Sequence, residues 1–221
     1  MNADFHLKNF DLLIFDWDGT LIDSIDWIVH CLQQAAIACD LPPSTVQAAK
    51  NVIGLSINNA MQTLFPSADA PTLAKLIAYY SAINISKPLG REQLFAGAYD
   101  LLCELKARGY LLAVATGKTR KGLNEVLRTT ATEDLFTITR CADETASKPA
   151  PLMLSQILHC TQITAQRSLL IGDSVHDIAM AHNAGISAVA VSCGANTQAE
   201  LLALKPRLML NQVTDLQPFL E

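Results

Sequence analysis

The feature that most constrains the fold is the decapeptide DLLIFDWDGT, residues 11–20. Four consecutive apolar residues, Leu12–Phe15, have the length and composition of a strand that is buried on both faces. Asp16 and Asp18 follow at once, and two carboxylates about 4 Å apart repel each other by roughly 4 kcal/mol at an effective dielectric of 20. We therefore expect a buried strand whose end holds a cation, a shared proton or a reaction.

Short apolar runs bounded by turn residues recur later in the chain. Strands are predicted at Leu12–Phe15, Tyr110–Ala115, Phe136–Thr139, Ser168–Ile171 and Ala188–Ser192, with an edge strand at Arg207–Leu210. Helical patterns separate the later runs, and strands that alternate with helices are typical of a parallel sheet. The sequence predicts an α/β fold with a doubly wound, Rossmann-like parallel sheet.

Residues 22–90 break this alternation. Amphipathic helices are predicted at Ile25–Cys39, Ser44–Val52, Ile57–Phe65 and Ala70–Ile83, with proline or glycine between them. This interval is far longer than an ordinary connection between strands. We therefore expect an inserted α-helical cap domain at residues 22–90 and a core domain made from residues 1–21 and 91–221.

Composition restricts the partners. The 221 residues carry a formal net charge of −5 without a long basic run, so neither nucleic acid nor an anionic membrane is an expected partner. No apolar run reaches the ~18 residues of a membrane span, and the N-terminus lacks the pattern of a signal peptide. The six cysteines form no C-x-x-C pair. A reduced, cytoplasmic protein is predicted, either a monomer or a homodimer, with a small molecule as its partner.

Three of the predicted strands end in polar residues. The endings are Asp16, Thr116-Gly117 and Gly172-Asp173-Ser174, with Asp177 one turn beyond. In an open parallel sheet, ligands bind beyond the carboxyl ends of the strands, so these side chains are expected at one edge. Lys148 stands before Pro149, in a loop that leads into a helix, and is expected at the same edge.

The residue types at this edge fit phosphate chemistry. Asp16, Asp18, Asp173 and Asp177 form a set of carboxylates that suits a hard divalent cation, Mg²⁺ above all. Thr116, the amides after it and Lys148 supply donors and positive charge for a phosphate. A carboxylate can attack phosphorus to form an aspartyl-phosphate, and a second acid can protonate the leaving alcohol and then activate water.

In this order, the motifs resemble those of the haloacid dehalogenase superfamily. Its phosphatases carry an Asp-x-Asp-x-Thr motif, which residues 16–20 match, and a Thr or Ser after the second strand, which Thr116 matches. A lysine upstream of the fourth strand matches Lys148, and an acidic motif matches residues 172–177. The cap position resembles the C1 type, and among subfamilies the chain most resembles the phosphoglycolate phosphatases.

The resemblance implies roles for the acidic residues. Asp16 is then the nucleophile and a metal ligand, and Asp18 is the general acid and base with its backbone carbonyl on the metal. Asp173 is a direct ligand of Mg²⁺. Whether Asp177 binds the metal directly or through water is left open.

The same resemblance assigns the phosphate-binding residues. Thr116 and Gly117 hold phosphate oxygens, and Lys148 neutralises charge on the phosphate and on the nucleophile. In the cap, Lys50 is a candidate partner for the carboxylate of a small substrate such as glycolate. We expect a Mg²⁺-dependent phosphatase that hydrolyses a small phosphomonoester through an aspartyl-phosphate, with 2-phosphoglycolate as the first candidate.

Three alternatives remain. A phosphosugar phosphatase or mutase of the same superfamily is one, although its mutases tend to carry an arginine where this chain has Ile57. A receiver-type phospho-signalling module also uses Asp, Thr and Lys at a sheet edge, but Asp18 would serve no purpose there. The dehalogenases of the superfamily lack the second aspartate, so Asp18 disfavours dehalogenation.

Overall fold

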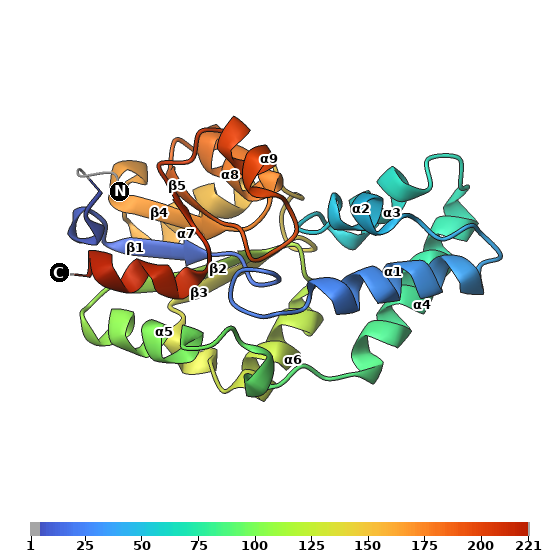
Figure 1. Ribbon diagram of the computed structural model, residues 1–221, viewed down its shortest axis with the longest axis horizontal. Coiled ribbons are helices and arrows are strands. Elements are labelled where there is room, and N and C mark those ends of the chain that lie inside the picture. Colours follow the sequence, from blue (N-terminus) through green and yellow to red (C-terminus); the bar gives the residue numbers. More distant parts are fainter. Residues whose placement is uncertain (1–4, 221) are drawn as a thin grey trace.

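The computed structural model describes residues 5–220, which form a core lobe and a helical lobe (Figure 1). The core lobe contains a six-stranded sheet in the order β3-β2-β1-β4-β5-β6, and every neighbouring pair is parallel. The strands are β1 (Leu12–Phe15), β2 (Leu111–Thr116), β3 (Ile138–Cys141), β4 (Ser168–Gly172), β5 (Ser187–Val191) and β6 (Leu208–Leu210). The predicted doubly wound α/β fold is confirmed.

Helices cover both faces of the sheet and build the second lobe. The helices of the core are α5 (Ala98–Ala107), α6 (Arg120–Thr130), α7 (Leu152–Thr161), α8 (Val175–Asn183) and α9 (Gln198–Ala203). Short 3-10 helices lie at Leu7–Asn9, Arg91–Gln93, Glu133–Leu135, Ala165–Arg167 and Val213–Phe219. Among residues 5–220, no helix combines the length and the apolarity that crossing a bilayer requires.

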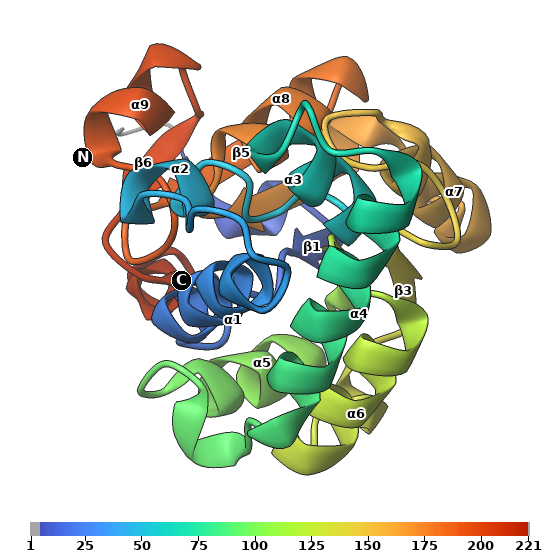
Figure 2. The same cartoon turned by 90° about the vertical axis from the view of Figure 1, so that its right-hand side faces the viewer.

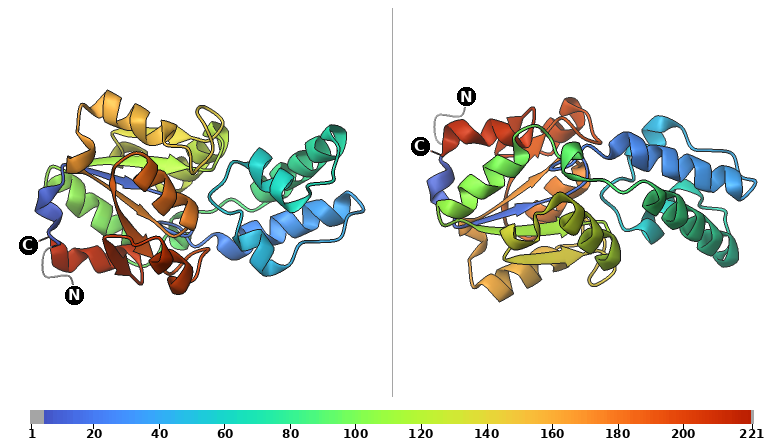
Figure 3. Two further views of the ribbon diagram at one scale, coloured as in Figure 1. Left: turned by 90° about the horizontal axis from the view of Figure 1, so that it is seen from above. Right: turned by 90° about the horizontal axis from the view of Figure 1, so that it is seen from below.

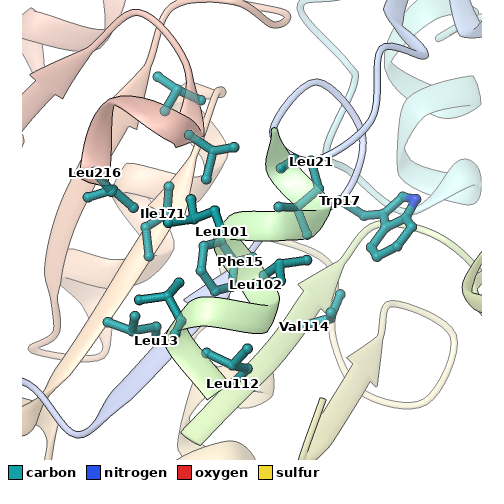
Figure 4. Packing of buried hydrophobic residues seen from close by; sticks show 14 of the residues in the cluster. Leu13, Phe15, Trp17, Leu21, Leu101, Leu102, Leu112, Val114, Ile171 and Leu216 are labelled. Carbon is teal, nitrogen blue, oxygen red and sulfur yellow. The ribbon is translucent and has the colours of Figure 1, made fainter. Parts of the chain in front are cut away.

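Successive strand residues feed two hydrophobic clusters, one on each face of the sheet. Leu13 and Phe15 of β1 point to the face covered by α5, α6 and the 3-10 helix at Val213–Phe219. Leu12 and Ile14 point to the opposite face, which α7, α8 and α9 cover. Figure 4 shows the first cluster, where the side chains of β1 and β2 meet those of α5. Burial on both faces explains why these strands are almost wholly apolar.

The helical lobe stands beyond the carboxyl ends of the strands (Figures 1 and 2). Its helices are α1 (Ile25–Ala38), α2 (Val46–Lys50), α3 (Ile57–Leu64) and α4 (Ala70–Ser86). They share a separate hydrophobic cluster, and the views from above and below show the lobe apart from the sheet (Figure 3). An isolated antiparallel bridge joins Ile22 to Leu94, where the chain leaves and re-enters the core. The cap boundaries at 22 and 90 stay a prediction, and residues 1–4 and 221 of the expected core lie outside the described residues.

Some predicted bounds differ from the structure. The strand predicted at Phe136–Thr139 lies two residues later, at Ile138–Cys141. Phe136 instead packs against the Trp17 ring, with 6.1 Å between ring centroids. The strand is at the edge of the sheet and only Cys141 in it is fully buried, so its apolar pattern is a weak signal. Helix α2 is shorter than predicted, at Val46–Lys50, and α4 continues to Ser86.

Candidate active site

Three neighbouring strands bring the predicted polar residues to one edge of the sheet. Strand β1 lies between β2 and β4, so Asp16, Thr116 and Asp173 stand at the carboxyl ends of adjacent strands. The backbone N–H of Asp16 donates to the carbonyl of Ile171 at 2.9 Å, which continues the pairing of β1 with β4 beyond Phe15. All three polar side chains are buried. The strand order therefore assembles residues that are far apart in the sequence.

Three carboxylates meet at this edge. Asp16, Asp173 and Asp177 each offer an oxygen within 4.8 Å of the others, and all three residues are buried. Burial raises the pKa of Asp16 well above its ordinary value, although the charge of Lys148 opposes the shift. Burial and the nearby Asp177 raise the pKa of Asp173 to about 7. Buried oxygen donors in this number fit a hard divalent cation such as Mg²⁺.

Lys148 lies within the carboxylate cluster. Its Nζ is 2.7 Å from Oδ1 of Asp16 and donates a hydrogen bond to Oδ1 of Asp177 at 2.7 Å. Burial by itself disfavours the charged ammonium, but the two carboxylates outweigh it and hold the pKa of Lys148 above its ordinary value. The lysine is therefore a fixed positive charge beside Asp16.

Asp173 is held from both sides of its carboxylate. The Thr20 hydroxyl donates to Oδ1 at 2.8 Å, and the backbone N–H of Ala195 donates to Oδ2 at 2.7 Å. Gly19 and Gly194 approach so closely that a Cβ would lie 2.4 Å and 2.0 Å from Oδ2. Gly19 also has a φ of +77°, which favours glycine. Glycine at both positions lets the backbone close around this carboxylate.

Asp177 belongs to the start of helix α8. Ser174 is the N-cap residue, and its hydroxyl and backbone N–H both donate to Oδ2 of Asp177, at 2.5 Å and 3.1 Å. Since Lys148 binds Oδ1, both oxygens of Asp177 have protein partners. A capping box of this kind normally serves the helix alone; here its carboxylate also faces the acidic cluster.

The Asp18 side chain points to a different set of partners. Ser24 donates to Oδ1 at 2.6 Å, and Lys118 Nζ lies 2.9 Å from Oδ2. The side chains of Asp18 and Lys118 are about one tenth exposed, at 10% and 12%. The partners of the Asp18 side chain, Ser24 and Lys118, thus lie outside the acidic cluster, although Asp18 is only two residues from Asp16.

Thr116 and Gly117 lie where the core meets the cap. The Thr116 hydroxyl accepts from the backbone N–H of Lys118 at 3.2 Å. A Cβ on Gly117 would lie 2.5 Å from the carbonyl oxygen of Leu55 and 2.6 Å from that of Gly54. Gly54 and Leu55 belong to the loop between α2 and α3, residues 51–56, which is called the cap loop below. This loop also contacts the core where the backbone N–H of Ser56 donates to the Ser147 hydroxyl at 2.8 Å.

A cavity of about 620 Å³ opens between the cap and the core. Asp16, Asp18, Thr116 and Gly117 line it on the core side. Lys50 is not among its lining residues in the described chain; its Nζ lies 4.0 Å from Oδ1 of Asp26. Lys148, Asp173 and Asp177 do not line this cavity but cluster with Asp16, which does, and Lys50 is part of neither group.

Sequence reasoning gave no catalytic-site role to four residues that hold the acids in place. They are Thr20, Ser24, Lys118 and Ala195. Thr20 stands inside the Asp-x-Asp-x-Thr motif and Lys118 directly follows Thr116-Gly117, so motif position could have found both. The Ala195 contribution is a backbone amide, which carries no side-chain signal in a sequence.

Known proteins are similar to this chain over most of its length. The family described as haloacid dehalogenase-like hydrolase matches residues 13–191. A protein of Dickeya dadantii (strain 3937) named "probable phosphatase IndB" is 29% identical over 208 residues, 92% of this chain and 90% of that protein. The pyrophosphatase PpaX of Bacillus mycoides (strain KBAB4) is 28% identical over 213 residues, 94% of this chain and 95% of that protein.

Solved structures share the fold over almost the whole chain. A haloacid dehalogenase-like hydrolase from Bacteroides fragilis has a TM-score of 0.84 at 26% identity, covering 94% of this chain and 99% of that one. A predicted phosphoglycolate phosphatase from Haemophilus somnus 129PT has a TM-score of 0.84 at 22% identity, covering 96% and 99%. At this identity, the second likeness concerns the fold alone.

Proposed function

The chain belongs to the haloacid dehalogenase-like hydrolase family, and we propose that it is a Mg²⁺-dependent phosphatase that hydrolyses a small phosphomonoester through an aspartyl-phosphate on Asp16. One observation carries the proposal: Asp16 lies beside a buried lysine and two further buried carboxylates at the end of the central strand. The names of the relatives, a phosphatase and a pyrophosphatase, support hydrolysis of phosphate compounds.

The donor set fits a magnesium ion. Asp16 and Asp173 would contribute carboxylate oxygens, and Asp18 its backbone carbonyl. Asp177, which Ser174 and Lys148 hold in place, would act through water. When bound, Mg²⁺ neutralises negative charge on the phosphate and on the attacking carboxylate.

The residues of the chain then divide the reaction into two steps. Asp16 attacks phosphorus and the bond to the leaving oxygen breaks, which forms the aspartyl-phosphate. Thr116, the amide of Gly117 and Lys148 hold the phosphoryl oxygens, and Lys148 balances the charge that develops there. Asp18 protonates the leaving alcohol and then takes a proton from the water that releases phosphate.

Asp18 has to change partners to perform this role. Its carboxylate contacts Ser24 and Lys118, and both contacts must break before it can reach the leaving oxygen. These partners hold Asp18 at the edge of the cavity that receives the substrate. We infer that substrate entry, which brings a phosphate near Lys118, releases the aspartate.

Other reactions have weaker support. Ile57 stands where mutases of the superfamily tend to carry arginine, and Asp18 disfavours both dehalogenation and a receiver-type module. 2-Phosphoglycolate and pyrophosphate are the first compounds to compare, the former from the subfamily resemblance and the latter from the name of a relative. A substrate role for Lys50, a cytoplasmic location, and a monomeric or homodimeric state stay predictions.

Phosphate release with a mixed panel of phosphomonoesters tests this function. Wild-type protein should release phosphate in the presence of Mg²⁺ and stop when a chelator removes the metal. Asp16→Asn should fall to background, while Asp100→Asn, exposed on α5, should keep wild-type activity. Equal release by wild type and Asp16→Asn would overturn the proposal.

A further inference from the structure

We propose that the leaving group of the substrate is an uncharged, mainly apolar alcohol, so that the substrate is an alkyl or arylalkyl phosphomonoester. This inference rests on the proposed function and concerns the same site. It goes beyond that function by selecting against phosphorylated carboxylates and against polyphosphates. The walls of the cavity between the cap and the core favour such a leaving group.

The cap side of the cavity is predominantly aliphatic. Its apolar lining residues in the cap lobe include Ile28, Leu32, Val52, Ile53, Ile57 and Ile85. They come from α1, α3, α4 and the loop between α2 and α3. A charged leaving group placed against such a surface would lose its hydration without gaining a partner. An apolar group would gain free energy from the same contact.

Two of the three lysines that line the cavity have partners. Lys118 lies 2.9 Å from Asp18, and Lys87 stands over the Trp27 ring, 5.2 Å from its centroid. Lys121 and Glu125 line the cavity from α6, and Glu125 is paired with Arg128, whose Nη2 lies 2.7 Å from Oε1. Within the described chain, the other charged residues of the lining are Asp16 and Asp18, both of which belong to the candidate active site. Lys121, on the core helix α6, is the lining lysine that forms no ion pair or ring contact with a described residue, so the aliphatic wall of the cap carries no unpaired cation of its own.

The neutral polar groups of the cap fit an alcohol with at most one polar substituent. Tyr80 and Asn84 line the cavity, and the Asn84 amide donates to the Tyr80 hydroxyl at 3.0 Å. Burial raises the pKa of Tyr80, so the phenol keeps its proton over the whole working range of pH. A neutral hydroxyl gives orientation without requiring charge on the ligand.

The size of the cavity agrees with a leaving group larger than glycolate. About 620 Å³ lies within the range of roughly 300–1,000 Å³ that binds small organic ligands. The two carbons of glycolate would leave most of the aliphatic wall without contact. A branched or aromatic group would fill it.

A series of primary alkyl phosphates provides the test, because their leaving alcohols have similar acidity. Ethyl, butyl and benzyl phosphate are compared with 2-phosphoglycolate and pyrophosphate at saturating Mg²⁺. We expect kcat/KM to rise about fourfold for each added methylene that is buried. 2-Phosphoglycolate should fall below ethyl phosphate. A higher kcat/KM for 2-phosphoglycolate or pyrophosphate than for butyl phosphate would overturn the inference while leaving phosphatase function intact. Background release from all compounds would overturn both.

A pair of cap variants separates contact with the ligand from general effects on the cap. Ile85 and Ile37 are both exposed on cap helices, at 67% and 51%, but only Ile85 lines the cavity. Ile85→Ala should lower the ratio of kcat/KM for benzyl phosphate to that for ethyl phosphate at least threefold. Ile37→Ala should leave the ratio unchanged. An unchanged ratio in Ile85→Ala, or the same fall in both variants, would contradict the inference.

Discussion

At the scale of single residues, the strongest electrostatic constraint falls on Lys148. Its ammonium is buried between Asp16 and Asp177 at 2.7 Å from each, and the pKa of the lysine is held above its ordinary value. A buried ion pair adds little net stability compared with an apolar replacement of the whole pair. Removing one partner is different, because it leaves a charge buried without compensation.

Lys148→Met should therefore destabilise the protein by about 3–5 kcal/mol and abolish phosphate release. Urea unfolding of the metal-free protein measures the first effect. The control is Lys75→Met, exposed on α4, which should stay within about 0.5 kcal/mol of wild type. Adding Asp177→Asn to Lys148→Met should recover part of the lost stability. Equal stability of Lys148→Met and Lys75→Met would contradict this account of Lys148.

At the scale of elements, the loop after β2 and the cap loop touch at Gly117. A Cβ at this position would lie 2.5 Å from the Leu55 carbonyl oxygen, a contact that real Cβ atoms do not make. Gly117→Ala should therefore push the cap loop away from the catalytic edge. We expect kcat/KM to fall at least tenfold with little change in the urea midpoint of the core. An unaltered kcat/KM would mean that the loop gives way without consequence.

The N-terminus of α9 fastens the loop that holds Asp173. Thr197 caps the helix, its N–H and hydroxyl both donate to Glu200 at 2.8 Å, and Asn196 donates to the same carboxylate at 3.3 Å. Ala195, next in the loop, donates to Asp173. Hydrogen bonds from Thr197 lower the pKa of Glu200 below its ordinary 4.5. A depressed carboxyl pKa contributes stability above the unfolded-state pKa, and this contribution is lost as pH falls through the folded-state pKa.

Thr197→Ala should cost about 1 kcal/mol near pH 7, and Thr197→Ser should cost much less because it keeps the capping hydroxyl. The difference between wild type and Thr197→Ala should shrink as pH falls below 4.5, where Glu200 becomes protonated. Thermal unfolding at several pH values measures this difference. A difference in stability between wild type and Thr197→Ala that grows as pH falls would contradict this role of Glu200.

How far the sequence predicts these elements depends on how much of each is buried. Strands β1 and β4 are central and wholly buried, and the predicted bounds agree with the structure within one residue. Edge strand β3 is largely half-exposed, and its prediction was two residues early. The catalytic residues at the ends of β1, β2 and β4 could be predicted because polar residues interrupt apolar runs there. The contacts of Asp18 with Ser24 and Lys118 could not, since they depend on side-chain directions after the chain leaves the strand.

At the scale of the whole molecule, the carboxylate cluster couples metal binding to stability. A ligand that binds only the folded state adds about 2.7 kcal/mol to the free energy of unfolding when its concentration is 100 times its Kd. For a chain of 221 residues, this corresponds to a rise in Tm of roughly 5–11 °C. Asp173→Asn should lose most of the rise, and Asp100→Asn should keep it. The same Mg²⁺ shift in all three proteins would place the metal elsewhere.

The division into two lobes also separates two kinds of selectivity. The core edge gathers the groups that react with phosphate, and the cap supplies most of the apolar wall that meets the leaving group. Changes in the cap should therefore alter the choice of alcohol, while changes at the ends of β1, β2 and β4 should alter every substrate alike. The Ile85 and Ile37 variants test the first half of this statement.

The central claim is that Asp16 carries the phosphoryl group during turnover. The most direct measurement is acid quenching of Asp18→Asn during reaction with 4-nitrophenyl phosphate, followed by mass spectrometry of its peptides. This leaving group needs little protonation, whereas loss of Asp18 slows the attack of water, so the intermediate should accumulate. We predict one phosphoryl group on Asp16, and none when Mg²⁺ is chelated before the substrate is added. Release of nitrophenol with no phosphoryl group on Asp16 at any quench time would contradict the account.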